Sequence, residues 1–269
     1  MKVQKNKFCC QRDNLTIRGY EYKTDGDKKP IAIVSHGFMA NQGTVKHYAK
    51  FFAEHGFAAY CYDFCGGCVM MGKSDGKTTD MSVLTEVNDL IAVIEYAYSL
   101  PYTDESNVLL MGCSQGGFVS AIAASKLKDK IKKLVLFYPA LCISDDARNG
   151  QMMFAKFDPK NIPEIVSCGP MKLGKCYVEA VVGMNPYEEI KDYENDVMIV
   201  HGTADKIVDI KYAKEAVVIY KEKTDRTVQY YEIDGGAHMF SKKHDKIAMQ
   251  YLEKFIRHSE LPDGTCCHD

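Results

Sequence analysis

Short apolar segments alternate with amphipathic segments along most of this 269-residue chain. Each apolar segment has the length of a buried strand. These segments are residues 31–35, 57–62, 108–112, 133–138, 197–201 and 228–233. The segments with helical periodicity are residues 44–55, 82–100, 116–127, 211–221 and 242–258. This alternation predicts an α/β fold, in which helices cover both faces of a mostly parallel sheet.

Two regions depart from the alternation. Residues 1–30 are polar and rich in turn-forming residues, and their one alternating segment, 15–22, predicts an edge strand. Residues 139–193 are interrupted by Gly and Pro and show no long helical period. Long irregular insertions usually serve as lids or binding loops. We therefore expect a core made of residues 1–138 and 194–269, with residues 139–193 inserted as a lid.

Composition excludes several classes of function. Lys plus Arg number 34 and Asp plus Glu 36, so no strong basic field exists and nucleic acid is not an expected partner. No apolar run approaches the roughly 20 residues that span a bilayer, so no membrane association is expected. No secretory signal is visible, and eleven cysteines in a chain of this size favour free thiols in the cytoplasm.

The string Gly112-Cys113-Ser114-Gln115-Gly116 fits the pattern G-x-S-x-G. It follows a predicted strand and opens a predicted helix, which is the context of a nucleophile elbow. In such a turn the Ser hydroxyl is presented at the start of a helix, where free N–H groups favour developing negative charge. The string therefore predicts that Ser114 is a catalytic nucleophile.

A Ser hydroxyl needs a base, and in this fold the acid and the His follow the Ser along the chain. Asp205 comes just after the predicted strand 197–201, and His238 comes after the next one. Both lie at the carboxyl edge of the sheet, where Ser114 lies. We expect His238 to act as general base and Asp205 to orient it. Asp209 and Asp234 are rival acids, and His201 is expected to be structural.

An acyl-transfer enzyme also needs donors for the oxyanion of its intermediate. The backbone N–H of Gln115, directly after the nucleophile, is one expected donor. The loop after the first core strand should supply the other. There, Gly37 gives the chain freedom to turn the N–H of Phe38 inward.

With these residues in place, the chain resembles an α/β-hydrolase of the serine aminopeptidase S33-like superfamily, and in particular the bacterial cinnamoyl (feruloyl) esterases. The strings that carry the resemblance are His36-Gly37-Phe38, residues 72–76, the elbow, residues 157–163, residues 173–177, residues 201–205 and Gly236-Ala237-His238. The resemblance implies an α/β-hydrolase fold with an inserted lid over the acyl pocket. It also implies hydrolysis of hydroxycinnamoyl esters.

The resemblance further implies that lid side chains bind the ring hydroxyls of the substrate. Asp146 and Tyr177 stand at the matching positions, and a third position is Met153, where some relatives have Gln. The alternative is that Asp146 is a solvated turn residue and that Tyr177 is a packing aromatic. Lid residues diverge with substrate, so both interpretations stay open.

A second departure from the relatives is residues 63–72, which form a longer turn here and contain Cys65-Gly66-Gly67-Cys68. A C-x-x-C pair can indicate redox or zinc chemistry. No second pair or His follows at ligand spacing, and the segment does not start a thioredoxin-like helix. The sequence therefore predicts plain loop thiols and no metal site.

The leading hypothesis is a serine esterase that acts on a small-molecule ester, without metal or organic cofactor. One alternative is a short-acyl or monoacylglycerol esterase, or a serine aminopeptidase, on the same scaffold. Another is a non-enzymatic binding module, which typically lacks a triad member. A homodimer, common among soluble proteins, stays open.

Overall fold

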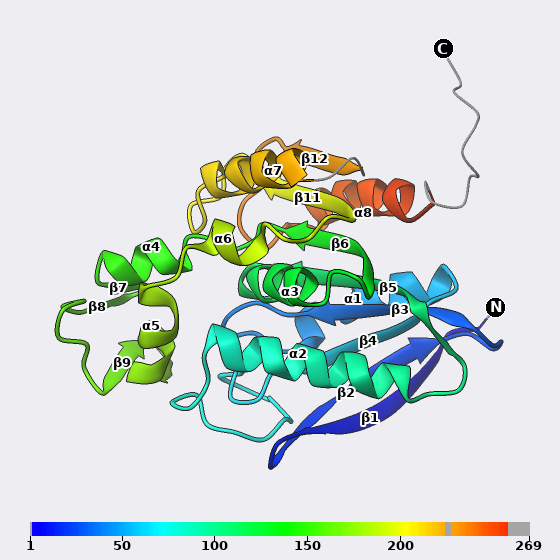
Figure 1. Ribbon diagram of the computed structural model, residues 1–269, viewed down its shortest axis with the longest axis horizontal. Coiled ribbons are helices and arrows are strands. Elements are labelled where there is room, and N and C mark those ends of the chain that lie inside the picture. The colour runs from blue at the N-terminus through cyan, green and yellow to red at the C-terminus, as the bar shows by residue number, and fades with distance from the viewer. Residues whose placement is uncertain (1, 224–226, 258–269) are drawn as a thin grey trace.

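The computed structural model describes residues 2–223 and 227–257, built around one eight-stranded sheet (Figure 1). The strand order is β1-β2-β4-β3-β5-β6-β11-β12. The strands are β1 (Gln4–Arg12), β2 (Leu15–Lys23), β3 (Lys29–Ser35), β4 (Ala58–Asp63), β5 (Thr103–Cys113), β6 (Ile131–Phe137), β11 (Asp196–Gly202) and β12 (Val228–Ile233). The last six are parallel, and β2 joins them through an antiparallel pair with β4. The expected α/β-hydrolase architecture is thus confirmed.

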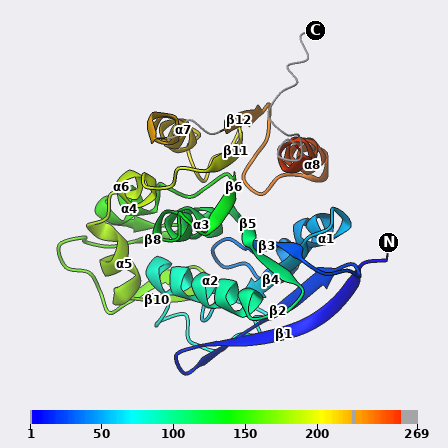
Figure 2. The same ribbon diagram turned by 45° about the vertical axis from the view of Figure 1, so that its right-hand side comes forward.

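Helices cover both faces of this sheet (Figure 2). On one face lie α1 (Lys46–Glu54), which follows the short 3-10 helix η1 (Gln42–Thr44), and α8 (Lys242–Arg257). On the other lie α2 (Val83–Tyr98), α3 (Gln115–Lys126) and α7 (Lys211–Lys223). Each face has its own buried hydrophobic cluster, so the central strands are apolar on both sides.

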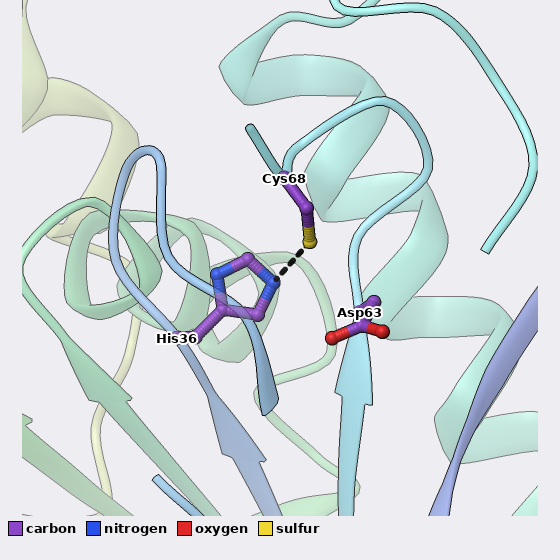
Figure 3. A group of neighbouring side chains, drawn as sticks. All are labelled: His36, Asp63 and Cys68. Carbon is purple, nitrogen blue, oxygen red and sulfur yellow. Dashed lines mark hydrogen bonds between the residues drawn. The ribbon is translucent and has the colours of Figure 1, made fainter. Parts of the chain in front are cut away.

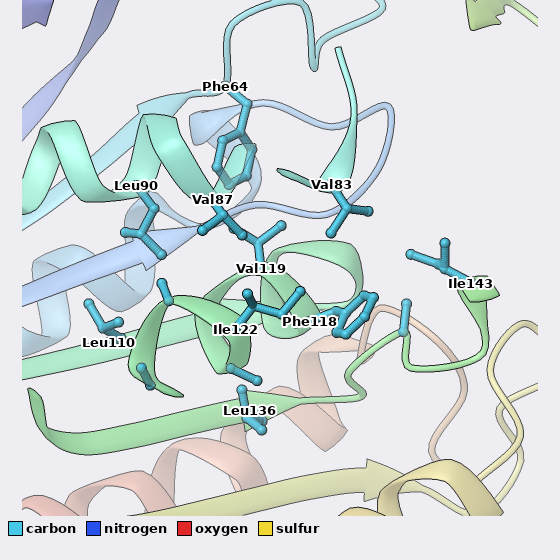
Figure 4. Close-up of a cluster of buried hydrophobic side chains, with 14 of the residues drawn as sticks. Phe64, Val83, Val87, Leu90, Leu110, Phe118, Val119, Ile122, Leu136 and Ile143 are labelled. Atoms are coloured by element: carbon cyan, nitrogen blue, oxygen red, sulfur yellow. The ribbon is translucent and has the colours of Figure 1, made fainter. Parts of the chain in front are cut away.

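The side chains of α2 and α3 interlock above the sheet (Figure 4). Val87 and Leu90 of α2 and Val119 of α3 are each at most 1% exposed, and Leu110 of β5 closes the cluster from below. Helix α2 begins with a reciprocal cap, in which Thr85 N–H donates to Ser82 and Ser82 N–H donates to the Thr85 hydroxyl. This packing fixes α3, and with it the turn that joins β5 to α3.

The segment between β6 and β11 is built from short elements. They are α4 (Ile143–Arg148), β7 (Gln151–Met152), β8 (Ala155–Lys156), β9 (Ile165–Cys168), β10 (Met171–Gly174), α5 (Lys175–Val182) and α6 (Pro186–Ile190). The four strands form two small antiparallel hairpins outside the main sheet. Helices α4 and α5 pack on each other at the end of the molecule where the β5–α3 turn lies (Figure 1).

Residues 15–22 form a strand as predicted, but the prediction that this strand lies at the edge of the sheet was wrong. β2 is the second strand, and β1 lies outside it in an antiparallel hairpin. Only Phe8 of β1 is buried, so the strand carries no apolar alternation from which it could be predicted. The predicted helix 44–55 also begins later, at Lys46, because Thr44 still belongs to η1. In the part of the chain that the structure describes, no helix is long and apolar enough to cross a membrane.

Candidate active site

Ser114 occupies a strained turn between β5 and α3. Its φ of 55° is positive, which is uncommon for a residue with a Cβ and is typical of a nucleophile elbow. The turn is tight because glycines flank it. A Cβ on Gly112 would lie 2.0 Å from the carbonyl oxygen of Gly116, and a Cβ on Gly116 would lie 2.3 Å from that of His36. The two glycines thus allow the end of β5, the start of α3 and the loop after β3 to approach one another beside Ser114.

The structure brings Ser114, His238 and Asp205 together. Oγ of Ser114 lies 2.9 Å from Nε2 of His238, and Nδ1 of His238 lies 2.8 Å from Oδ2 of Asp205. A carboxylate only accepts, so Nδ1 carries the proton and Nε2 is free to accept from the Ser114 hydroxyl. This is the arrangement in which a histidine can remove the proton of a serine.

Asp205 is held as an ionised group. Burial would raise its pKa, but hydrogen bonds from His201, His238 and the Val208 N–H lower the pKa well below its usual range. Its Oδ1 accepts from Ile207 N at 2.9 Å and from Val208 N at 3.0 Å. A carboxylate with this many donors can stabilise an imidazolium without taking its proton.

The two rival acids have other partners. Asp209 accepts a hydrogen bond from the backbone N–H of Lys211 at 2.9 Å, at the start of α7. Asp234 accepts one from the Thr203 hydroxyl at 3.3 Å. Of the three candidates, Asp205 is therefore the one that contacts His238 in the described structure.

The two expected oxyanion donors flank Ser114. Gln115 is the first residue of α3, where a backbone N–H has no acceptor within the helix. Phe38 follows Gly37, and a Cβ on Gly37 would lie 3.0 Å from Cβ of Ser114. The loop after β3 thus passes directly against the serine, and a Cβ at position 37 would crowd it.

The side chain of Gln115 is fixed by a buried hydrogen-bonded chain. The Tyr177 hydroxyl donates to Oε1 of Gln115 at 2.5 Å, and Nε2 of Gln115 donates to Oε2 of Glu86 at 2.7 Å. Burial raises the pKa of Glu86 well above its ordinary value, and the Gln115 hydrogen bond opposes that rise only in part. This row of hydrogen bonds connects α5, in the segment between β6 and β11, to α3 and α2.

Two cavities meet at Ser114. The larger, of about 650 Å³, is lined by His238 and has mostly apolar walls that include Met39, Tyr138 and Phe240. The smaller, of about 170 Å³, is lined by Gln115 and by the inserted segment. Four residues line both cavities, namely Phe38, Ser114, Met153 and Ile207. An ester bound at Ser114 therefore has room for one group on each side.

The three expected lid residues all line the smaller cavity. Asp146 is partly buried, and desolvation raises its pKa, with the neighbouring charge of Asp145 adding to the rise and a hydrogen bond from Cys142 opposing it. Tyr177 is 1% exposed and is engaged with Gln115, as described above. Met153 adopts a positive φ of 52° and stands at the boundary of the two cavities.

Sequence reasoning missed two contacts of the triad. His201 is fully buried, and its Nε2 lies 3.0 Å from the Val208 carbonyl oxygen and 3.2 Å from Oδ2 of Asp205. Its position four residues before Asp205 was the signal that could have found it. The ring of Tyr138 packs edge-on against the His238 imidazole, with centroids 4.8 Å apart. This second contact joins residues that are far apart in the sequence.

The fold and the Ser–His–Asp arrangement define an α/β-hydrolase, and comparisons with known proteins agree. Residues 26–196 match the family described as serine aminopeptidase, S33. Because this match spans more than half of the chain, the protein belongs to that family.

Individual proteins give further comparisons. The structure of Est1E from Butyrivibrio proteoclasticus with ferulic acid bound has 26% sequence identity and a TM-score of 0.85, and the match covers 94% of this chain and 100% of Est1E. The α/β hydrolase GrgF from Penicillium sp. sh18 shares the fold, with a TM-score of 0.72, 17% identity, and coverage of 97% of this chain and 100% of GrgF. An uncharacterized 31.7 kDa Escherichia coli protein is 28% identical over 46% of this chain, and this chain spans 42% of that protein.

Proposed function

We propose that this α/β-hydrolase is a serine carboxylic-ester hydrolase that acts through an acyl-enzyme. The observation that carries the proposal is the pair of contacts at His238, 2.9 Å to Ser114 and 2.8 Å to Asp205. In the proposed reaction, Nε2 of His238 takes the Ser114 proton while Oγ attacks the ester carbonyl. The backbone N–H groups of Gln115 and Phe38 stabilise the oxyanion.

His238 then acts as an acid. The imidazolium gives its proton to the leaving alcohol oxygen, and Asp205 stabilises the positive charge until that transfer. Water enters on the same side, loses a proton to Nε2, and releases the acid from Ser114. The alcohol must therefore lie beside His238, which lines the larger cavity, and the acyl group lies in the smaller one.

The smaller cavity supports a hydroxycinnamoyl acyl group. Its apolar lining includes Ala140, Ile143 and Met152, which suit a flat ring and its propenoyl chain. The carboxyl of Asp146 offers an acceptor for a ring hydroxyl. The Tyr177 hydroxyl already donates to Gln115, so toward the substrate it would act as an acceptor. Est1E, which has this fold and binds ferulic acid, also supports this acyl group.

The larger cavity supports a bulky alcohol. Its walls carry Met39, Tyr138 and Phe240, and its rim carries His47 and Asp245, whose side chains pair at 3.4 Å. Methionine and aromatic walls accept ligands of variable shape. The substrate would thus be an ester of a small aromatic acid with a larger, partly polar alcohol.

Asp146 also favours a second candidate, a serine aminopeptidase. A carboxylate in the acyl cavity could hold the ammonium group of a peptide substrate. Asp145 is not available for that role, because it is bound by Arg148 at 2.5 Å and by the Tyr212 hydroxyl at 2.8 Å. An ammonium group has three N–H donors and a phenol has one O–H donor, so a single carboxylate accepts the whole donor capacity of the phenol but only part of that of the ammonium.

The test compares three substrates at matched concentration, with wild type and Ser114→Ala. They are methyl ferulate, p-nitrophenyl butyrate and an aminoacyl anilide. We expect methyl ferulate to be turned over fastest and all activity to fall by at least about 1000-fold in Ser114→Ala. Hydrolysis of the anilide faster than that of methyl ferulate would favour the aminopeptidase. Hydrolysis of p-nitrophenyl butyrate faster than that of methyl ferulate would indicate a short-acyl esterase. Activity that survives in Ser114→Ala would contradict the proposed nucleophile.

A further inference from the structure

Three side chains that the proposed reaction does not use converge at the oxyanion loop, which is the loop after β3 that carries Phe38 (Figure 3). His36 follows the end of β3, Asp63 ends β4, and Cys68 lies in the loop after β4. One possible ligand atom from each lies within 4.8 Å of the other two. Figure 3 shows the three side chains pointing toward one another.

We propose that His36, Asp63 and Cys68 bind a zinc ion. Imidazole nitrogen, carboxylate oxygen and thiolate sulfur are all zinc ligands, and three protein ligands leave a fourth position for water. Nε2 of His36 lies 3.8 Å from Sγ of Cys68. Two ligands of one tetrahedral zinc, with bonds of about 2.0–2.3 Å, lie roughly 3.5 Å apart, so the pair needs little adjustment.

The histidine is already oriented as a metal ligand. Its Nδ1 donates to the Gly37 carbonyl oxygen at 2.8 Å, which leaves the lone pair on Nε2. Metal-binding histidines commonly donate their other ring N–H to a carbonyl in this way. Within the described residues, Nε2 accepts a hydrogen bond from Phe64 N–H at 3.2 Å and lies 3.8 Å from the Cys68 thiol. Zinc would replace the Phe64 contact.

Charge balance gives an independent argument. Asp63 is 1% exposed, and among residues 2–223 and 227–257 no cationic side chain pairs with it. Its oxygens are bound by neutral N–H groups, Gln42 N at 2.8 Å and Lys73 N at 2.9 Å. A buried carboxylate without a cation is costly. A zinc ion with one carboxylate and one thiolate is neutral overall, which removes that cost.

The two cysteines of the C-x-x-C string have different surroundings. Cys68 is partly exposed, and an isolated parallel backbone bridge joins it to Met39. Cys65 is buried, its backbone N–H donates to Asp89 at 2.8 Å, and it is not part of the metal-ligating group. In the proposed zinc site, Cys68 is thus joined by His36, from a loop distant in the sequence, and not by Cys65.

A zinc ion here would brace the oxyanion loop. His36 directly precedes Gly37 and Phe38, and Met39 is bridged to Cys68. The loop would then be tied to the loop after β4 through both a backbone bridge and a metal. Binding itself does not depend on the proposed ester hydrolysis, so its readouts need no turnover.

The experiment titrates the full-length, chelator-treated protein with Co²⁺ and then with Zn²⁺. The parent carries Cys266→Ser and Cys267→Ser, so that the two C-terminal thiols contribute no metal binding. We expect one Co²⁺ per chain with a thiolate-to-cobalt charge-transfer band, and displacement of that ion by Zn²⁺. Cys68→Ser should abolish the band and weaken Zn²⁺ binding by at least about 100-fold. Cys65→Ser should leave both unchanged.

Other outcomes overturn the site. They are the absence of the band in the parent, its survival in Cys68→Ser, and an equal loss in Cys65→Ser. Thermal unfolding without metal checks that each variant folds. Should Cys68→Ser fail to fold, X-ray absorption of the zinc-loaded parent decides, because a zinc spectrum without a sulfur ligand near 2.3 Å contradicts the proposal.

Discussion

His201 points its buried Nε2 toward Oδ2 of Asp205, 3.2 Å away. The same oxygen accepts the hydrogen bond from Nδ1 of His238 at 2.8 Å. His201 thus contacts the proposed acid directly. It does not touch the reacting atoms, and we infer that it is a positioning residue. Its second contact, with the Val208 carbonyl oxygen, fixes its own orientation.

Replacement of His201 by Leu should lower kcat about 10- to 100-fold, which corresponds to the loss of one hydrogen bond to a charged group. KM should change little, because His201 lies outside both cavities. Steady-state kinetics with an ester that the wild type hydrolyses measures both quantities. His201→Gln keeps an N–H near the position of Nε2 and should recover most of kcat. A loss that Gln does not rescue, with an equal fall in melting temperature for both variants, would show a purely structural role.

Asp146 gives a prediction about specificity. If its carboxyl accepts the hydrogen bond of a ring hydroxyl, Asp146→Leu should reduce kcat/KM for methyl caffeate by about 10-fold or more. Methyl cinnamate, which has no ring hydroxyl, should be nearly unaffected. The ratio of the two kcat/KM values therefore isolates this contact. Asp145→Asn is the matched control, because Asp145 does not line the smaller cavity. An unchanged ratio in Asp146→Leu would remove Asp146 from the proposed acyl site.

The sequence allowed the elbow and the triad to be predicted because their signals are local. G-x-S-x-G between a strand and a helix defines the turn at Ser114. Asp205 and His238 each follow a strand, and parallel strands present their carboxyl ends at one edge. The sheet register then brings these residues together with no further information.

The contacts that cross between elements could not be predicted in this way. Tyr177 reaches Gln115 across 62 residues, and Cys68 reaches His36 across 32. Neither pair has a spacing signal, because the separation depends on how loops pack. The expectation of plain thiols considered only ligands near Cys65 and Cys68 in the sequence. β1 was missed for another reason: it has one buried residue, so its sequence shows no apolar alternation.

The stability of the protein should depend on how β5, the strand that precedes the elbow, packs in the core. Leu110 is fully buried beneath α2 and α3, two residues before Gly112, the first glycine of the elbow (Figure 4). Leu110→Ala should lower the free energy of unfolding by about 2–5 kcal/mol, through lost burial and the cavity left behind. Urea unfolding measures this change. Leu84→Ala, on the exposed side of α2, should cost less than about 0.5 kcal/mol. Equal costs for both variants would contradict the packing argument.

Glu86 should give the protein a pH-dependent stability. Burial raises the pKa of Glu86 well above its ordinary value, so the folded chain holds a proton that the unfolded chain has released. Between the unfolded and folded pKa values, Glu86 therefore lowers the free energy of unfolding as pH rises. Its stabilising contribution is complete below the unfolded pKa and is lost as pH rises through the folded one.

Glu86→Gln keeps an acceptor for Gln115 and removes the titration. We expect the variant to lose stability less steeply with rising pH, and the difference in slope above pH 4.5 to correspond to about one proton. Urea unfolding at a series of pH values measures the slope for wild type and variant. Glu105→Gln, at the exposed start of β5, is the control and should leave the slope unchanged. Parallel curves for wild type and Glu86→Gln would mean that Glu86 is ionised in the folded protein at those pH values.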